Sequence, residues 1–309
     1  MSGSFSRGAV LRLTEHPMFR RLATSHAIGW RVASRFVAGE SLQDVLRVAR
    51  ELREQDIATM LDHLGENVRT PEHATDAENA YVRALETIGA DPDLDAAISI
   101  KLTQLGLDLS EELCRAHVQR VLETAAAVDR LVMIDMESSE YVERTLALFA
   151  SFRERSERIG ICLQAALKRT PSDVFALPER SVVRLVKGAY LEPQEIAFQR
   201  RGDVDRAFAR LAVTVLARGH TLHAATHDPR LVEGLRRLLD QGRAPASRIE
   251  FQMLYGIRRD LQVRLASAAY PVRVYVPYGT EWYPYLTRRL AERPANLWFF
   301  LSNLVRSGR

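Results

Sequence analysis

The sequence predicts a distorted (β/α)8 barrel of the TIM type, with a helical arm at its N-terminus. Short apolar runs rich in Val, Ile and Leu alternate with helical stretches over most of the chain. Runs that are apolar on both faces indicate parallel strands covered on both sides. A chain of 309 residues, 47% of them hydrophobic, is long enough to bury such a barrel as one domain. The expected strands are 57–64, 98–103, 131–136, 161–165, 182–187, 221–226, 249–254 and 272–277.

The first helices are predicted from their caps and apolar spacing. Helical spacing begins after Ser41, and Ser41 with Asp44 resembles a capping box. Thr75 is expected to cap the next helix with Glu78 at its third position, and Gly89 to end it. We divide the chain into an arm at 1–56, with helix expected near 23–38, and a barrel domain at 57–309.

The later helices have similar signals. Asp203 is expected to open one that ends at Gly219. Asp228 and Pro229 supply an N-cap and a proline at the first helical position, and Gly242 ends that helix. The helices expected between the strands cover 110–127, 139–156, 171–178, 203–218, 228–241 and 256–269.

The composition argues against a nucleic-acid-binding, a disulfide-rich or a membrane-spanning protein. The 43 basic and 39 acidic residues are spread along the chain, which argues against a nucleic-acid binder because such proteins concentrate basic charge. Cys114 and Cys162 lie far apart in apolar patterns and are expected to be buried thiols in a reducing compartment. Without an apolar signal segment or a run of membrane-spanning length, we expect a cytoplasmic protein that is at most peripheral to a membrane.

Isolated polar residues stand near the carboxyl ends of the expected strands. In a barrel these ends meet at one mouth, where enzymes of this fold carry out their chemistry. Each residue alone could be a satisfied core group, but a buried charge without a partner is costly, and a complementary set indicates a site. These residues are Lys101, Asp135, Gln164, Arg184, Lys187, His227 and Tyr275. Because Arg184 and Lys187 have opposite parity along a strand, Lys187 is expected to act from the following loop.

A helix expected over 282–292 adds a second polar group. Tyr285, Arg288, Arg289 and Glu292 fall at helical spacing on one face. Two adjacent guanidinium groups are suited to holding a carboxylate. An ordinary surface helix with an Arg–Glu pair is the alternative.

The residues alone indicate a barrel enzyme that acts on a small carboxylate. Lys101 could instead form a Schiff base, as in an aldolase-type lyase. A metal site in a barrel needs several His and carboxylate ligands at strand ends, but only one His and one Asp are found there, so no metal is expected. No Gly-x-Gly-x-x-Gly follows a strand, which argues against a Rossmann-type dinucleotide site but not against a flavin held in a barrel.

Six segments together resemble the proline dehydrogenase family of flavin-dependent barrels. They are Ser-Ile-Lys-Leu, Ile-Asp-Met-Glu, Arg-Leu-Val-Lys-Gly-Ala-Tyr, Ala-Thr-His, Glu-Phe-Gln-Met-Leu-Tyr-Gly and Tyr-x-x-Arg-Arg. The resemblance as a whole covers about residues 57–296. The resemblance implies FAD-dependent oxidation of L-proline to Δ1-pyrroline-5-carboxylate, the first step of proline catabolism to glutamate. It further implies hydride transfer from proline C5 to the flavin and passage of the electrons to a membrane quinone.

The same resemblance implies substrate-binding residues. Lys101, Arg288 and Arg289 would hold the proline carboxylate. Tyr275, Tyr285 and Leu254 would wall the ring pocket.

It also implies catalytic and cofactor residues. Asp135 would stand beside the substrate site and order Lys101 or a neighbouring polar group, and Arg184 would lie near the flavin nitrogen that accepts the hydride. The remaining residues implied to hold FAD are Met136, Gln164, Lys187, Gly188, Ala189, Thr226 and His227. A catalytically inactive barrel used for binding is a further alternative, disfavoured because the charged residues are all present.

Overall fold

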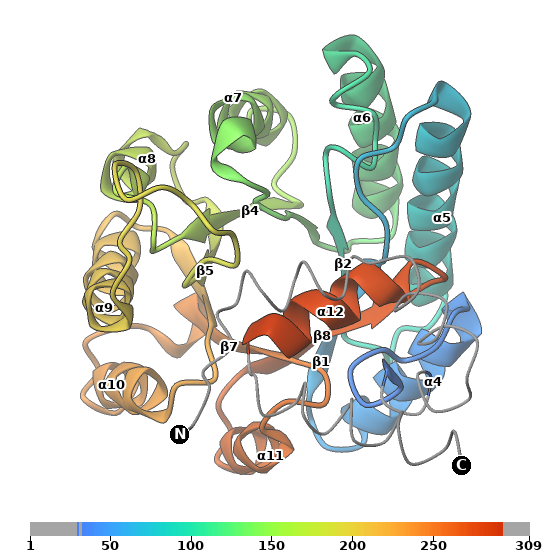
Figure 1. Ribbon diagram of the computed structural model, residues 1–309. Coiled ribbons are helices and arrows are strands. Elements are labelled where there is room, and N and C mark those ends of the chain that lie inside the picture. The colour runs from blue at the N-terminus through green and yellow to red at the C-terminus, as the bar shows by residue number, and fades with distance from the viewer. Residues whose placement is uncertain (1–29, 31–32, 293–309) are drawn as a thin grey trace, which may run out of the picture.

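The chain folds as a closed barrel of eight parallel strands in sequential order, which confirms the predicted fold class (Figure 1). The computed structural model describes residue 30 and residues 33–292, apart from the side chains of residues 288 and 290–292. Each strand pairs with the next, and β8 closes the barrel on β1 with Met60 opposite Tyr275. The strands are β1 (Ala58–His63), β2 (Ala96–Ile100), β3 (Val132–Ile134), β4 (Ile159–Gln164), β5 (Val182–Val186), β6 (Thr221–Ala225), β7 (Ile249–Leu254) and β8 (Val272–Tyr278).

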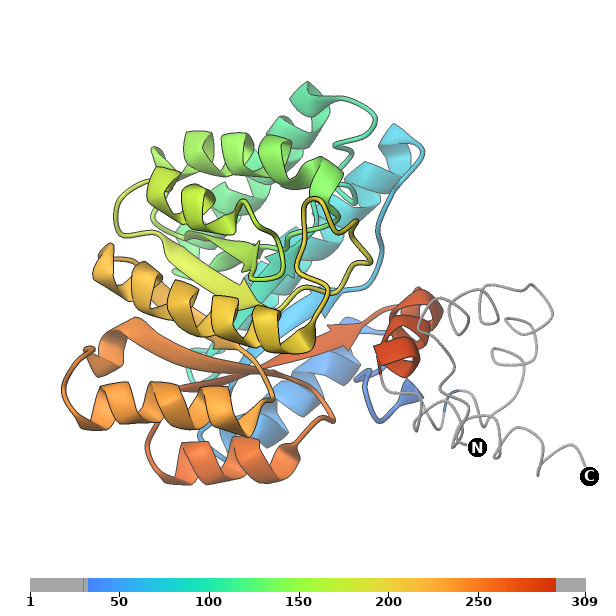
Figure 2. The same cartoon turned by 60° about the vertical axis from the view of Figure 1, so that its left-hand side comes forward.

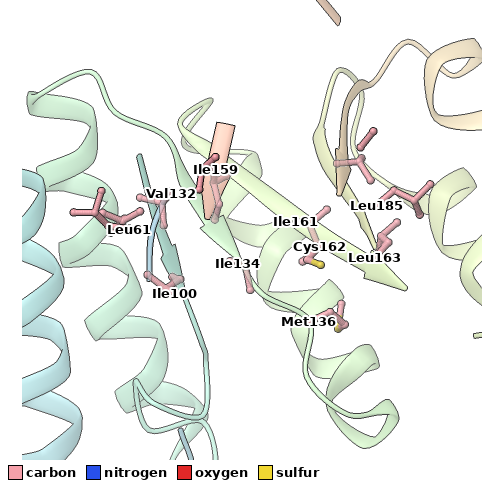
Figure 3. Close-up of a cluster of buried hydrophobic side chains, with 14 of the residues drawn as sticks. Leu61, Ile100, Val132, Ile134, Met136, Ile159, Ile161, Cys162, Leu163 and Leu185 are labelled. Atoms are coloured by element: carbon pink, nitrogen blue, oxygen red, sulfur yellow. The ribbon is translucent and has the colours of Figure 1, made fainter. Parts of the chain in front are cut away.

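Helices surround the sheet, and the main apolar core lies between the two layers. Strand residues such as Ile98, Ile161 and Leu185 are buried in this core. Figure 3 shows one part of it around β2, β3, β4 and β5. The helices after the strands are α5 (Pro71–Gly89), α6 (Glu111–Ala127), α7 (Val142–Arg153), α8 (Thr170–Ala176), α9 (Arg201–Ala217), α10 (Pro229–Asp240), α11 (Arg259–Ser267) and α12 (Trp282–Glu292), with 3-10 turns η1 (Ser139–Tyr141) and η2 (Ala246–Arg248).

The helix before the first strand and the helix after the last strand depart from the regular barrel arrangement, in which the last helix packs on the outside of the sheet. The helix α12 lies across the carboxyl end of the barrel, beyond the tip of β8 (Figure 2). The helix α4 (Leu42–Arg53) precedes β1 and packs beside β1 and β8, the position that α12 leaves open. Its apolar face is buried, and the capping box of Ser41 and Asp44 is present as predicted. Because α12 lies at the mouth of the barrel, its side chains are close to the carboxyl ends of the strands.

Two predicted helix starts are wrong. The helix α5 begins one turn before Thr75, because Thr70 is the N-cap and Pro71 fills the first position, where a missing N–H costs nothing. Thr75 donates instead to the carbonyl of Pro71 at 3.0 Å. The helix α9 begins at Arg201, so Asp203 lies in its first turn and is not its cap.

Other signals are confirmed. Asp228 caps α10 by accepting from the N–H of Arg230 at 3.1 Å, with Pro229 at the first position. Gly89 is the last residue of α5, and the glycines at 219 and 242 follow their helices with positive φ. The helix expected near 23–38 falls largely outside the described residues, and the division of the chain at residue 56 stays a prediction.

Residues 33–39 contact the carboxyl end of β8 and the turn that follows β7. Ala38 donates its N–H to the carbonyl of Pro277 at 2.9 Å, and Ala33 and Val37 are fully buried. The turn after β7 approaches this segment closely at Gly256. That glycine has φ +76°, and a Cβ there would lie 1.7 Å from the carbonyl oxygen of Arg35.

Replacing Gly256 by alanine is therefore expected to destabilise the fold by about 3 kcal/mol, because left-handed strain adds to a backbone clash. Gly234→Ala is a matched control, since Gly234 lies within α10 and a Cβ there meets nothing within 4 Å. That change is expected to stabilise by about 1 kcal/mol. Urea unfolding measures both. Equal stability of Gly256→Ala and the unaltered protein would contradict the close packing of this turn.

Candidate active site

A cavity of about 1640 Å³ opens at the carboxyl end of the barrel. It is lined by residues at the ends of strands and by α12. The predicted site residues that line it are Lys101, Asp135, Met136, Gln164, Arg184, Lys187, Gly188, Ala189, Thr226, His227, Leu254, Tyr275, Tyr285 and Arg289. The side chain of Arg288 lies outside the described residues. Sequence reasoning therefore located the cavity, while the individual roles stay predictions.

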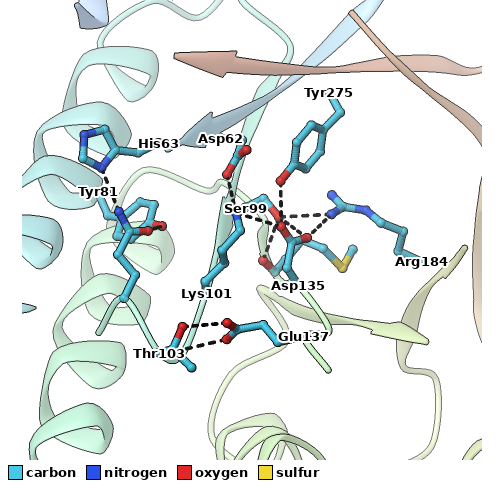
Figure 4. A network of polar contacts seen from close by, with 12 residues as sticks. Asp62, His63, Tyr81, Ser99, Lys101, Thr103, Asp135, Glu137, Arg184 and Tyr275 are labelled. Carbon is cyan, nitrogen blue, oxygen red and sulfur yellow. Dashed lines mark hydrogen bonds and ion pairs between the residues drawn. The ribbon is translucent and has the colours of Figure 1, made fainter. Parts of the chain in front are cut away.

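Asp135 is the centre of the polar contacts in this cavity (Figure 4). Its Oδ1 accepts from Ser99 Oγ at 2.7 Å and from Arg184 Nη1 at 2.5 Å. Its Oδ2 accepts from the Tyr275 hydroxyl at 2.6 Å and lies 3.3 Å from Lys101 Nζ. Burial raises the pKa of Asp135, but Lys101 and Arg184 outweigh it and the pKa lies below its usual value. Asp135 is thus an ionised carboxylate that fixes two cations.

Lys101 follows the last residue of β2 and lies between two carboxylates. Its Nζ donates to Asp62 Oδ1 at 2.7 Å, and Asp62 is 1% exposed. Burial lowers the pKa of Lys101, but the charge of Asp62 reverses the effect, and the pKa lies well above its ordinary value. Lys101 is therefore a protonated ammonium. Sequence reasoning missed Asp62, although an acid after the apolar residues of the first strand is the same signal that identified Asp135.

Arg184 lies on β5, with its side chain inside the barrel. Its Nε donates to Gln252 Oε1 at 2.8 Å and its Nη1 to Ser99 Oγ at 3.0 Å. The guanidinium carbon lies 5.1 Å from the centre of the Tyr275 ring. Within the described part of the chain, Nη2 is buried without a hydrogen-bond partner. A buried N–H group of a cation without an acceptor is costly. Arg184 is also one of the residues that line the cavity.

The expectation that the strands are apolar below their carboxyl ends is wrong. Charged and polar side chains fill the barrel interior beneath Arg184. Gln252 Nε2 donates to Glu250 Oε1 at 2.7 Å and lies 2.9 Å from His223 Nδ1. Arg273 donates to both oxygens of Glu250, at 3.0 and 3.1 Å. The alternation of Glu250 and Gln252 with apolar neighbours was present in the sequence, but the segment was interpreted as a continuous apolar run.

This interior cluster makes stability depend on pH. Burial lowers the pKa of His223 to about 4, against 6.5 for a free histidine. Between these values the unfolded chain binds the proton and the folded chain does not, so stability falls as the pH falls. Burial opposes ionisation of Glu250, but Arg273 outweighs it and the pKa is about 2, so the contribution of Glu250 is lost only below pH 4.5.

We expect His223 to account for a loss of about 2 kcal/mol in unfolding free energy between pH 7.5 and pH 5. His223→Gln keeps an acceptor for Gln252 but does not titrate, so its stability should vary less over this range by that amount. Urea unfolding at the two pH values gives the difference. Parallel pH profiles for both proteins would contradict a neutral buried His223.

The residues predicted to hold a cofactor lie on or just after β4, β5 and β6, except Met136, which follows β3. Gln164 donates its Nε2 to the carbonyl of Glu137 at 2.9 Å. Gly188 has φ +117°, and a Cβ there would lie 3.1 Å from Ala166 Cβ and 3.3 Å from Gln164 Oε1, so a side chain at this position would be strained and tightly packed. Lys187 follows β5, as parity requires, and pairs with Asp205 on α9 and with Asp228 at 3.1 Å.

Two further predicted residues contact the protein itself. His227 Nε2 accepts from the N–H of Leu254 at 2.9 Å, so the imidazole fixes the end of β7. Thr226 Oγ1 accepts from the N–H of Asp228 at 3.2 Å. Both groups order turns around the cavity.

On α12, Tyr285 and Arg289 face the same cavity. Tyr285 is buried, and the Arg289 guanidinium carbon lies 5.4 Å from the centre of its ring. The predicted four-residue face of this helix is thus present for Tyr285 and Arg289. The side chains of Arg288 and Glu292 lie outside the described residues.

Comparison with known proteins agrees with this geometry. A family model described as proline dehydrogenase matches residues 45–301. The chain is 38% identical to proline dehydrogenase 1 of Bacillus subtilis over 89% of its length and 91% of that protein. It is 36% identical to the proline dehydrogenase of Deinococcus radiodurans over 97% of its length and 98% of that protein.

Solved structures share the fold. Proline utilization A (PutA) from Bdellovibrio bacteriovorus, inactivated by N-propargylglycine, superposes with a TM-score of 0.78 at 22% identity. A variant of PutA from Bradyrhizobium japonicum gives a TM-score of 0.71 at 25% identity. This chain covers 35% and 31% of those two chains, so it spans about a third of their length. On the family match and on its two relatives of similar length, the chain belongs to the proline dehydrogenase family.

Proposed function

We propose that this protein is an FAD-dependent enzyme that oxidises L-proline to Δ1-pyrroline-5-carboxylate. The observation that carries the proposal is the pair of cations, Lys101 and Arg184, held by one carboxylate, Asp135, whose side chain is 14% exposed in the cavity. The pair offers one cation for an anionic substrate and a second for an electron-accepting group. Family membership gives the substrate class.

The volume of the cavity supports the binding of a flavin together with a small substrate. Its volume exceeds the ~300–1,000 Å³ that encloses a typical drug-sized ligand. Arg184 Nη2 is a buried donor without an acceptor among the described residues, and the backbone at Gly188 leaves room that a side chain would fill. Bound there, FAD would supply a two-electron acceptor for the hydride that leaves proline C5. The residues proposed to hold it are Met136, Gln164, Arg184, Lys187, Gly188, Ala189, Thr226 and His227.

The protein's own residues would bind and orient proline. Lys101, fixed by Asp62 and Asp135, would hold the carboxylate from one side, and Arg288 with Arg289 on α12 from the other. Tyr275, Tyr285 and Leu254 would wall the ring. Because Asp135 accepts the hydroxyl hydrogen of Tyr275 and also contacts both cations, one carboxylate would set the relative positions of substrate clamp, ring wall and Arg184.

We further propose that a membrane quinone takes the electrons and that a cytoplasmic enzyme meets it by peripheral contact. None of the helices in the described ranges has the length and apolar character needed to cross a bilayer. Leu191 and Ile196 are 63% and 40% exposed on the loop between β5 and α9, which borders the cavity. If they form the contact, changing both to Ser should lower sedimentation with vesicles and leave reduction of a water-soluble quinone unchanged.

An absorbance spectrum, followed by anaerobic addition of L-proline, tests cofactor and reaction together. A flavin spectrum that bleaches with proline is expected. A flavin that ignores proline would redirect the search to another amine or imino acid. A protein that stays colourless after addition of FAD would overturn the proposal.

A Schiff-base lyase that uses Lys101 is the alternative from another class. Its lysine must be neutral to attack a carbonyl carbon. With Asp62 and Asp135 both in contact, the pKa of Lys101 lies well above its ordinary value in spite of burial, which disfavours this reading. Borohydride trapping of a covalent adduct on Lys101 would restore it.

A further inference from the structure

Gln252 connects the interior charge cluster of the barrel to Arg184. The glutamine lies on β7, is 3% exposed, and uses both ends of its amide. Its oxygen accepts from Arg184 Nε at 2.8 Å. Its nitrogen lies 2.7 Å from Glu250 Oε1 and 2.9 Å from His223 Nδ1. Gln252 is not among the residues proposed to bind the substrate or the cofactor.

The surroundings permit only one orientation of the amide. Glu250 is paired with Arg273, so its oxygens can only accept hydrogen bonds. His223 contacts Gln252 through Nδ1, which accepts when the ring proton is on Nε2. A flipped amide would place its oxygen against Glu250 and its N–H groups against Arg184. The cluster of Glu250, His223 and Arg273 therefore forces the Gln252 oxygen toward Arg184.

This oxygen completes the fixation of the guanidinium group. Asp135 and Ser99 hold Nη1, at 2.5 and 3.0 Å, from the opposite side of the barrel. With Nε and Nη1 both held, a planar guanidinium cannot rotate, and its third nitrogen is fixed as well. That third nitrogen is Nη2, the buried donor without a partner in the described part of the chain.

We propose that Gln252 is a positioning residue that sets the reduction potential of the bound flavin by holding Arg184 in place. The inference rests on the proposed function, because it requires a flavin in the cavity. A fixed positive group beside the cofactor stabilises the negative charge that two-electron reduction adds. When Gln252 is lost, Arg184 keeps its charge but gains freedom to turn its unpaired Nε toward other acceptors. The reduced flavin is then less stabilised, and the midpoint potential becomes more negative.

The test is Gln252→Leu in the flavin-loaded full chain. We expect a more negative midpoint potential in a dye-coupled reductive titration without proline. Anaerobic mixing with proline should show a rate constant for flavin reduction that is about tenfold lower, the effect of one buried hydrogen bond to a charged group. The KM for proline should change by less than about twofold, because the proposed carboxylate clamp is intact.

A matched control variant distinguishes loss of the contact with Arg184 from the general effect of removing a buried amide. Gln262 is also 3% exposed, and it donates to the backbone carbonyls of Leu254 and Ile257 without touching Arg184. Gln262→Leu is expected to leave the midpoint potential unchanged. If Gln252→Leu does not fold, Gln252→Asn serves, since the shorter amide cannot reach Arg184 and Glu250 together.

The outcomes are distinct. A flavoprotein that proline bleaches, but whose potential is the same in Gln252→Leu or Gln252→Asn, overturns the inference and leaves the proposed function standing. An equal shift in Gln262→Leu also overturns it, because any buried amide would then do. An unaltered protein that binds no flavin, or whose flavin ignores proline, shows failure of the proposed function instead.

Discussion

Replacing Lys101 by methionine is expected to raise the KM for L-proline by about 100-fold, a loss typical of a desolvated charge partner. It is also expected to lower the unfolding free energy by about 3 kcal/mol, because Asp62, 1% exposed, keeps no cation at 2.7 Å. Steady-state kinetics and urea unfolding measure the two effects separately. An unchanged KM would remove Lys101 from the substrate clamp.

A double variant separates the structural part from the binding part. Lys101→Met combined with Asp62→Asn removes both charges of this ion pair. The unfolding free energy should therefore regain most of what Lys101→Met alone loses, while the KM for proline stays high. Recovery of the KM in the double variant would mean that Lys101 acts only by neutralising Asp62.

Arg289→Met gives the matched comparison on the other side of the cavity. Arg289 is half-buried on α12 and lies over the Tyr285 ring. We expect its loss to raise the KM as well, because a second cation of the proposed carboxylate clamp is removed.

The sequence predicted the barrel because strands buried on both faces have a distinctive composition, and capping residues marked several helices. The start of α5 was predicted wrongly because two residues could each be its N-cap. Thr70 and Thr75 are both plausible caps one turn apart, and only Pro71, with no N–H to lose, decides between them. The position of α12 across the mouth could not be predicted, because amphipathic spacing defines a buried face without saying what covers it.

The site was predicted at strand ends and missed inside the barrel. Lys101 and Asp135 follow their strands directly, so isolated charges in apolar runs revealed them. Glu250, Gln252 and Arg273 lie deeper and pair with one another through neighbouring strands. Which polar side chains satisfy one another depends on strand register, and register was not available before the pairing of β7 with β8 was known.

Replacing Arg184 by methionine is expected to lower kcat for proline oxidation by about 1000-fold and to change the KM by no more than a few-fold. A group that stabilises charge developing during the reaction acts on kcat, whereas ground-state binding of the proline carboxylate is assigned to other residues. Anaerobic stopped-flow reduction of the flavin isolates this step. A large rise in the KM with unchanged kcat would make Arg184 a substrate-binding residue instead.

Arg184→Lys tests whether the positive charge alone is sufficient. Lysine keeps the positive charge but lacks the planar set of donors that contacts Gln252, Ser99 and Asp135 together. Activity between that of methionine and arginine is expected. Full activity with lysine would mean that charge alone is needed and that the fixed guanidinium plane has no role.

The two variants at positions 184 and 252 can be combined into one cycle. If Gln252 acts through Arg184, then Gln252→Leu should shift the flavin potential in the presence of Arg184 and have no further effect once Arg184 is methionine. Additive shifts would mean that Gln252 influences the cofactor by its own dipole. We expect the non-additive result, because Gln252 contacts Arg184 at 2.8 Å and Glu250 at 2.7 Å. Non-additive shifts would mean that Glu250 and the other charged residues inside the barrel help to orient Arg184 through Gln252.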